Sequence, residues 1–412
     1  MSLSVLYRFL WPEALNKLFT EAILSMVCLG LIIFQTPAFF ILLSRLLKGP
    51  GRRAPLQPSA PTTEMLGEVS IIVPTLNEVE RISPCLEGLT RQSYEVREIL
   101  IVDSNSQDGT RELVKKAGEN DPRIRLKTDE PLPRDWVGRP WALHSGFLFS
   151  SPKSQWILGI DADTQPQPGL VAAMVKAARE ENYDLLSLSP QFILYNPGEW
   201  WLQPALLMTL LYRFDSAGVR NHQPERVMAN GQCFLARRQV LEALDGYTAA
   251  AASFCDDVTL ARHAASLGYR VGFLDGSKVI KVRMYEGLRE TWEEWGRSLD
   301  LKDAASWSQT WGDVALLLFT QGLPLFLSLF LIACIISGYS FPTLYIALAL
   351  NLGLLGTRWG LLLAIYGCYA RSYQNKGSRW MFWLSPLADP LAVLRIYLSS
   401  VSRPTRWRGR EY

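Results

Sequence analysis

Cysteine is scarce in this chain, and no two cysteines have the spacing of a paired motif. A disulfide framework or a zinc site would need such pairs, so we expect reduced thiols. Net charge is also low, +3 at neutral pH, which excludes the basic surface of a nucleic-acid-binding protein. The chain has no internal repeat and no long low-complexity segment. The six cysteines are Cys28, Cys85, Cys233, Cys255, Cys334 and Cys368.

Long apolar runs, in contrast, are present near both ends of the chain. In residues 22–44 the only strongly polar side chain is Gln35, and a helix of this length crosses a roughly 30 Å hydrocarbon core. Residues 1–21 are mixed, unlike a cleavable signal peptide, so we expect this helix to stay in the mature protein. The basic residues that follow place the next segment in the cytoplasm by the positive-inside rule. They are Arg45, Lys48, Arg52 and Arg53.

Two further runs, residues 314–336 and 344–369, are each long enough to span the bilayer. Residues 380–400 are apolar too, but they contain prolines, Asp389 and Arg395. This composition favours a broken or interfacial helix over a fourth span. We therefore expect a multi-pass membrane protein with three spans and a cytoplasmic soluble domain.

One arginine, Arg358, lies inside the apolar run 344–369. A charge at this depth is unfavourable, and by default it indicates a function or a buried partner. Asp389 or a lipid phosphate is a candidate partner. The alternative is that the side chain extends to the interface from a shifted span.

Between the apolar runs, strand-like and helix-like segments alternate. Residues 69–74, 98–103 and 156–160 have the apolar character of buried strands, and helical patterns follow each of them. This alternation predicts parallel strands joined by right-handed crossovers. We expect a membrane segment at 1–48, a linker at 49–67, an α/β domain at 68–290, an interfacial amphipathic segment at 291–313 and membrane helices at 314–412.

Carboxylates follow two of the predicted strands. Asp103 ends one strand, and Asp161 and Asp163 come directly after another. Ligands of open α/β sheets bind at the carboxyl ends of the strands, so we expect a nucleotide at this edge. Two closely spaced carboxylates suit Mg²⁺ or Mn²⁺ bound together with a diphosphate and water. An ordinary acidic turn is the alternative.

Four motifs occur in the order typical of the inverting family 2 glycosyltransferases. They are Val-Pro-Thr-Leu-Asn-Glu at 73–78, Val102-Asp103 with Asp108-Gly109-Thr110, Asp161-Ala162-Asp163, and Cys-Asp-Asp-Val-Thr-Leu at 255–260. Over residues 68–280 the chain resembles that family. The resemblance implies a GT-A fold, which is a Rossmann-like mixed sheet, with a nucleotide-diphosphate sugar as donor and a divalent cation as cofactor.

The resemblance also implies roles for single residues at the donor site. Glu78 and Asp103 are expected to accept hydrogen bonds from the base and ribose, although a helix cap or turn is the alternative. Arg139 stands where the family commonly has lysine, and its guanidinium can bind diphosphate oxygens with two donors. Arg297 is a further candidate for the diphosphate. The expected donor-binding residues are Pro74, Glu78, Asp103, Arg139, Asp161 and Arg297, and the metal ligands are Asp161 and Asp163.

The catalytic base is expected at Asp257, which matches the second acid of the family's acidic dipeptide. Asp256 stands where glutamate is common, and an adjacent carboxylate favours a raised pKa, which suits a base. The alternative is a pair of acids at a helix start. We expect Asn230, Gly231 and Gln232 to line the acceptor or sugar pocket. Trp141 is expected to stack there, unless it packs within the protein.

The acceptor is expected to be a lipid. The Gln-x-x-Arg-Trp motif of processive polysaccharide synthases is absent, and an aromatic stretch at 292–311 leads into the membrane. Residues 131–142, 384–390 and 407–412 resemble membrane glycosyltransferases of carotenoids and other isoprenoids, especially the cyanobacterial carotenoid 2′-O-glycosyltransferases of myxol glycoside synthesis. This implies a carotenoid hydroxyl as acceptor. A polyprenyl phosphate, a hopanoid, diacylglycerol and a growing polysaccharide remain the alternatives.

Overall fold

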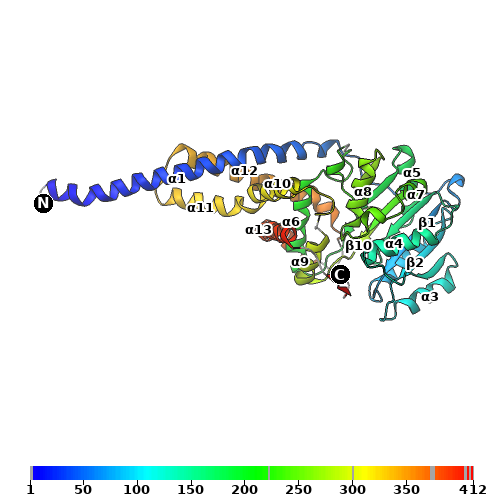
Figure 1. Ribbon diagram of the computed structural model, residues 1–412. Coiled ribbons are helices and arrows are strands. Elements are labelled where there is room, and N and C mark those ends of the chain that lie inside the picture. Colours follow the sequence, from blue (N-terminus) through cyan, green and yellow to red (C-terminus); the bar gives the residue numbers. More distant parts are fainter. Residues whose placement is uncertain are drawn as a thin grey trace.

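An α/β domain and an elongated group of helices make up the computed structural model (Figure 1). The structure describes residues 3–220, 223–298, 301–371, 376–402, 406–407 and 410–411, and their side chains over 17–220, 223–295, 301–371 and 376–402. The α/β domain follows the first long helix, and the remaining long helices return alongside that helix. A short β11 (Arg406–Trp407) and β12 (Arg410–Glu411) pair with each other near the end of the chain.

A seven-stranded mixed sheet forms the centre of the domain. The predicted strands are confirmed as β1, β2 and β4, which are parallel and almost entirely buried, as apolar strands covered on both faces should be. β8 runs antiparallel to both of its neighbours. In spatial order the strands are β3 (Ile124–Thr128), β2 (Val96–Asp103), β1 (Val69–Thr75), β4 (Trp156–Ile160), β8 (Cys233–Arg237), β6 (Leu185–Ser189) and β9 (Val271–Asp275).

Helices cover both faces of this sheet. Apolar side chains of α2 (Ile82–Thr90), α3 (Thr110–Asn120) and α5 (Leu170–Glu180) pack on one face. On the other face lie α4 (Gly138–Phe149), α7 (Arg238–Ala243) and α8 (Asp256–Ser266). A small second sheet joins β5 (Thr164–Pro166), β10 (Ile280–Val282) and β7 (Gln191–Phe192) beside the end of β4.

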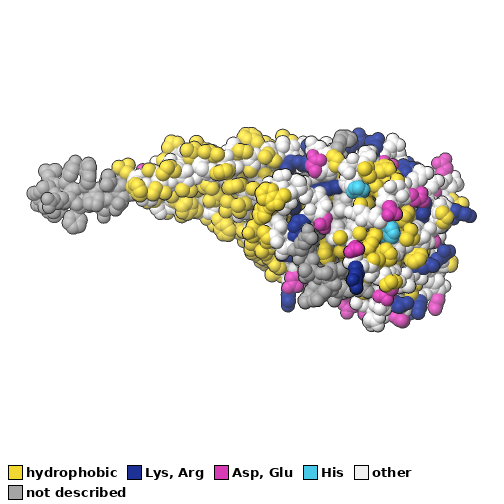
Figure 2. All heavy atoms as spheres, viewed as in Figure 1, with side chains coloured by type: hydrophobic (Ala, Val, Ile, Leu, Met, Phe, Trp, Pro, Cys, Tyr) yellow, Lys and Arg dark blue, Asp and Glu magenta, His cyan; other side chains and the backbone are white. Residues whose placement is uncertain are grey.

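Three long helices run side by side away from the domain (Figure 1). They are α1 (Leu3–Leu46), α11 (Pro324–Ile336) and α12 (Pro342–Ile365). Figure 2 shows hydrophobic side chains over this region, whereas charged side chains gather on the α/β domain. α10 (Trp307–Leu317) and the π-helix η5 (Leu318–Gly322) precede α11.

Among the described residues, three helices are long and apolar enough to cross a membrane: Lys17–Gly51, Pro342–Cys368 and Arg379–Val401. The predicted span at 314–336 is long and apolar enough to cross a membrane only if two helices, Trp307–Gly322 and Pro324–Ile336, count as one span. These two helices are bent by 46° relative to each other. The final segment consists of the 3₁₀ helix η8 (Arg379–Ala388) and α13 (Asp389–Val401). It is one of the three candidate spans by length and composition, so the expectation that it does not span stays a prediction. Figure 1 shows α13 nearly end-on, so it crosses the direction of α1.

Between the domain and the long helices lies α6 (Pro197–Arg213). A capping box of Asn196 and Glu199 starts this helix. Residues 200–212 are apolar and aromatic, a composition that is also typical of a helix on the membrane surface. In the structure α6 is instead buried under η8, α13 and α9 (Gly287–Ser298), so tertiary packing covers its aromatic face. Arg283 donates to Glu199 at 2.7 Å and fixes the start of α6 to the domain.

Arg358 has a buried protein partner in the structure. Its Nε donates to both carboxylate oxygens of Asp389, at 3.0 and 2.8 Å, and its Nη2 donates to Ser385 Oγ at 3.1 Å. Both charged residues are 2% exposed. Of the two candidate partners, Asp389 and a lipid phosphate, Asp389 is the one that Arg358 contacts in the structure, and the alternative of an arginine that reaches the interface is wrong.

Candidate active site

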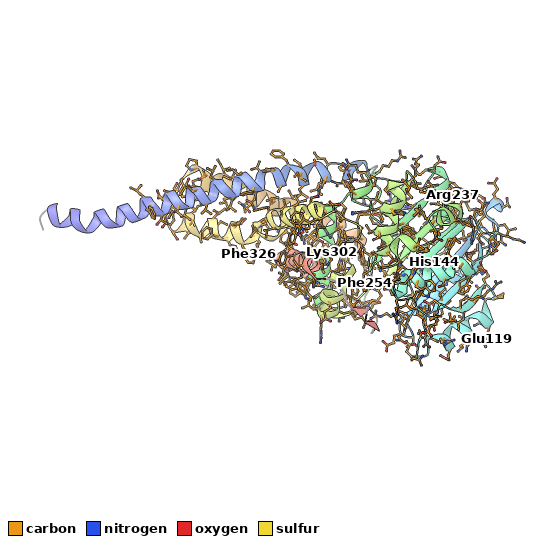
Figure 3. The ribbon with its side chains drawn as sticks, in the orientation of Figure 1. Glu119, His144, Arg237, Phe254, Lys302 and Phe326 are labelled. Carbon is orange, nitrogen blue, oxygen red and sulfur yellow. The ribbon has the colours of Figure 1, made fainter. Side chains whose placement is uncertain are left out.

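A cavity of about 650 Å³ lies where the carboxyl edge of the large sheet faces the helices. Phe254, labelled in Figure 3, lines it from the loop before α8. Most of the residues expected at the donor, metal, base and acceptor positions also line it. They are Pro74, Glu78, Arg139, Asp161, Asp163, Asn230, Gly231, Gln232, Asp256 and Asp257.

Pairing of β4 with β8 brings the residues around Asp161 next to the residues around Gln232. β4 and β8 are antiparallel neighbours, with Ile160 opposite Cys233. Asp161 therefore follows β4 at the point where Gln232 leads into β8, and the Asp161 N–H donates to the Gln232 carbonyl oxygen at 3.3 Å. Residues 71 positions apart in sequence are thus adjacent at one edge of the sheet.

Arg139, near the start of α4, lies at the centre of the charged group. Its Nε and Nη2 donate to Asp161 Oδ1 at 3.0 and 2.8 Å, and its Nη1 donates to Asp256. Nη2 also donates to the Gly231 carbonyl oxygen at 2.7 Å. A Cβ on Gly231 would overlap the guanidinium, so this close approach requires glycine. Burial acts to lower the pKa of Arg139, but Asp161, Asp256 and Asp257 outweigh it and raise that pKa.

Asp256 and Asp257 lie in the first turn of α8. The N–H groups of Gly231 and Val258 donate to Asp257 at 2.5 and 2.9 Å. Burial raises the pKa of both carboxyl groups, while the Arg139 guanidinium opposes the rise. The two carboxylates therefore also have the position that the alternative interpretation predicts, at the start of a helix. The raised pKa and the cavity position are what a catalytic base requires in addition.

The chemistry of Asp161 and Asp163 fits a divalent cation that is shared with a ligand. Both carboxylates line the cavity, and oxygen is the donor that Mg²⁺ and Mn²⁺ prefer. Among the described residues no group of three or more His, Cys, Asp or Glu side chains forms a metal site. A cation held here would therefore complete its coordination with phosphate oxygens and water, which is common for Mg²⁺.

Two expected site residues lie outside the cavity lining. Asp103 is 1% exposed and accepts from the Ser106 N–H at 3.0 Å, with Arg111 at 3.7 Å. Asp103 therefore supports the loop after β2 in this structure. Trp141 belongs to α4, where its indole N–H donates to the Asp129 carbonyl oxygen at 2.5 Å. Its expected place in the acceptor pocket is not seen, because the helix directs the ring toward neighbouring protein groups.

Arg297 and Asp108 are the two remaining candidates. Arg297 belongs to α9, but its side chain lies outside the part of the chain that is described. Asp108, the acid of the Asp-Gly-Thr motif, accepts from the N–H groups of Val79 and Thr110 at 2.9 and 3.0 Å. Burial acts to raise the pKa of Asp108, but the Thr110 hydroxyl, which donates to it at 2.6 Å, and these two N–H groups outweigh burial and lower that pKa. Such bonds are those of a turn residue.

Of α9, the sequence analysis named Arg297 but missed three residues that line the cavity. Glu290, Glu294 and Trp295 line the cavity, and Arg81 donates to Glu290 at 2.9 Å across it. The available signal was the spacing of the two glutamates, which are one helical turn apart and so lie on one face. Sequence alone gave no indication that this face turns toward the sheet.

Comparison with known proteins identifies the α/β domain. Residues 70–245 match the family described as Glycosyl transferase family 2. These residues are therefore similar in sequence to a family 2 glycosyltransferase domain. In three dimensions the chain is similar to the mannosyltransferase PcManGT from Pyrobaculum calidifontis in complex with GDP-Man and Mn²⁺, with a TM-score of 0.51 and 18% identity over 92% of this chain and 98% of that one. The expected GT-A fold is therefore confirmed.

Two curated relatives are similar to part of this chain. One is the 4,4'-diaponeurosporenoate glycosyltransferase of Staphylococcus haemolyticus (strain JCSC1435), 23% identical over 57% of this chain and 62% of that protein. The other is the undecaprenyl-phosphate 4-deoxy-4-formamido-L-arabinose transferase of Yersinia pestis (strain Pestoides F), 30% identical over 30% of this chain and 37% of that protein. The chain thus covers less than two thirds of the length of each relative.

Proposed function

We propose that this protein is a membrane-bound inverting glycosyltransferase that moves a sugar from a nucleotide-diphosphate donor to a hydroxyl group of a carotenoid-type lipid. The observation that carries the proposal is one continuous cavity. Its lining includes Asp161, Asp163 and Asp257 at the sheet edge, and apolar side chains of α6 and α12 at the other end. A polar donor and an apolar acceptor therefore have access to the same carboxylates.

The reaction would be a single displacement at the anomeric carbon. The acceptor oxygen forms a bond to that carbon, the bond from the carbon to the diphosphate oxygen breaks, and Asp257 takes the hydroxyl proton. Asp161 and Asp163 would hold the divalent cation, which when bound supplies positive charge for the leaving diphosphate. Arg139 adds a second cation beside the same carboxylates, and Glu78 and Pro74 line the nucleotide end.

The relatives favour a lipid acceptor but name two different ones. The staphylococcal name contains a carotenoid acid, diaponeurosporenoate, and the Yersinia name contains undecaprenyl phosphate. The motifs at 131–142 and 384–390 support the carotenoid class, including the myxol-type 2′-hydroxyl. The basic residues after the first apolar run support a cytoplasmic position for the catalytic domain.

A transfer assay tests the proposal directly. Membranes that contain the protein are incubated with a panel of labelled nucleotide sugars, Mn²⁺ or Mg²⁺, and a hydroxylated carotenoid. We expect label in a coloured, organic-soluble product with the wild type and none with Asp257→Asn. Donor binding without such a product would reject the carotenoid and leave other lipid acceptors to be assayed. No donor binding at all would contradict the glycosyltransferase function.

Replacing Asp163 with alanine should weaken metal-dependent donor binding by at least about tenfold to 100-fold, which is the effect of losing even an outer-shell metal partner. The carboxylate contributes charge and an oxygen ligand that alanine lacks. Titration of the nucleotide diphosphate by calorimetry, with and without Mn²⁺, measures the effect. Asp108→Ala is the matched control, because that carboxylate only caps a turn. Equal Mn²⁺ dependence in Asp163→Ala and wild type would contradict the metal assignment.

The acid limb of kcat/KM should lie above the ordinary aspartate pKa of about 3.9. Asp257 must be ionised to accept a proton, and burial raises its pKa, so activity is lost at a higher pH than for an exposed aspartate. The measurement is kcat/KM against pH with donor binding followed over the same range. A profile that stays flat down to about pH 4 would show that Asp257 has an unperturbed pKa or is not the base.

A further inference from the structure

Two apolar helix faces line the cavity at the end away from the carboxylates. On α6 the lining residues are Leu207, Leu210 and Leu211, with Phe214 just after the helix. Their spacing of three, four and seven residues places them on one side of a helix. The three leucines are only partly buried although their helix lies inside the protein, because they face this space.

The second face belongs to the end of α12 and has the same spacing. Leu361, Ala364 and Ile365 line the cavity, followed by Cys368. All four residues belong to the candidate membrane span Pro342–Cys368. The cavity therefore continues from the catalytic carboxylates to the level of a membrane-spanning helix. Leu46, at the end of α1, lines the same region.

Charge in the cavity lining is predominantly negative. Each described arginine of the lining lies within 4 Å of a carboxylate: Arg45 at 3.9 Å from Asp313, Arg52 at 3.3 Å from Asp275, Arg81 at 2.9 Å from Glu290 and Arg139 at 2.8 Å from Asp161. A second phosphate in addition to the donor diphosphate would be repelled here. The carboxylates of the lining are Glu78, Asp161, Asp163, Asp215, Asp256, Asp257, Asp275, Glu290 and Glu294.

We infer that the acceptor is a neutral, hydroxyl-bearing lipid whose hydrocarbon chain lies between the apolar faces of α6 and α12 and enters from the bilayer beside the end of α1. This inference rests on the proposed function and adds to it the place and charge of the acceptor. The two apolar faces give the chain surroundings like those that it has in the bilayer, so its hydrocarbon stays out of water while the hydroxyl reaches the site. The hydroxyl end then points along the cavity toward the carboxylates of the sheet edge.

A pair of adjacent substitutions on α12 tests the position of the chain. Ala364 lines the cavity, whereas Leu363 is 68% exposed and is not among the lining residues. In vesicles that contain the full-length protein, we expect Ala364→Trp to lower transfer to a hydroxylated carotenoid at least tenfold, mainly through KM. Binding of the nucleotide sugar should be unchanged. Leu363→Trp should transfer within twofold of wild type. Equal activity of Ala364→Trp and wild type would overturn the inference.

A cross-linking measurement keeps the two proposals separable. A long-chain alcohol that carries a diazirine is added to the same vesicles and photoactivated, and the labelled peptides are mapped. Labelling within 207–214 and 361–368 that Ala364→Trp reduces supports the inference, even if the wild type transfers no sugar, which would contradict only the proposed function. Labelling confined to other helices overturns it. Faster transfer to a polyprenyl phosphate than to the hydroxylated carotenoid would overturn its statement about charge.

Discussion

Asp257→Asn should reduce sugar transfer by about 10²- to 10⁴-fold, the usual contribution of a general base. Asparagine is close to aspartate in size. In the wild type the Gly231 N–H donates to Asp257 Oδ2 at 2.5 Å and the Val258 N–H donates to Oδ1 at 2.9 Å, so the single amide oxygen of asparagine can keep one of these two bonds. The bond that is kept, together with the buried side chains of α8, should hold the start of the helix in place. The substitution removes the site for the acceptor proton but leaves Asp161, Asp163 and Arg139 at the donor end.

Donor binding and transfer should accordingly respond differently. We expect the affinity for the nucleotide sugar, measured by calorimetry with Mn²⁺, to stay within a few-fold of wild type. Transfer to the lipid acceptor, measured as label in the organic phase, should fall by about 10²- to 10⁴-fold. Asp256→Asn is an informative companion, because its carboxylate pairs with Arg139 and its loss should weaken the donor end as well. An Asp257→Asn protein with full activity would remove Asp257 from the role of base.

The strands and acidic clusters could be predicted from sequence because their signals are local. Residues 156–160 are a short apolar run that ends at Asp161, and the structure has β4 over the same residues. Buried parallel strands must be apolar on both faces, so each one can be recognised in a single sequence as a continuous apolar run. The carboxylates follow them directly, and the edge of the sheet brings together those that line the cavity.

The partners of these groups were not visible, because they depend on long-range packing. Nothing within the sequence around Arg139 indicates that it contacts Gly231 and Asp256, which lie about a hundred residues away. The aromatic residues of α6 have the composition of a membrane-surface helix as well as that of a buried one. Burial by η8 and α13, which come much later in the chain, decides between the two. The expectation that Trp141 lines the pocket failed for a similar reason. The residue type alone does not tell whether a tryptophan is exposed in a loop or packed within a helix.

Breaking the buried ion pair of Arg358 and Asp389 should have a large effect on the stability of the protein. Removing one member of a buried ion pair leaves an uncompensated charge and costs about 3–5 kcal/mol, whereas replacing both with apolar residues is often neutral. Asp389 accepts from Arg358 Nε at 2.8 Å and from Gln321 Nε2 at 2.9 Å. It therefore joins α12, η5 and the start of α13. Asp389→Leu should strongly destabilise the helical part of the protein.

The double variant Arg358→Leu/Asp389→Leu should recover most of the lost stability, because no charge is then left buried between the helices. Unfolding in detergent, followed by thermal denaturation and by protease sensitivity, gives the free energies for a double-mutant cycle. Leu363→Ala, at an exposed position of α12, is the control for an unrelated change in the same helix. If the two single effects simply added in the double variant, the pair would not act as a unit. If stability recovered but sugar transfer did not, the charges of Arg358 and Asp389 would be needed for catalysis or acceptor binding rather than for packing alone.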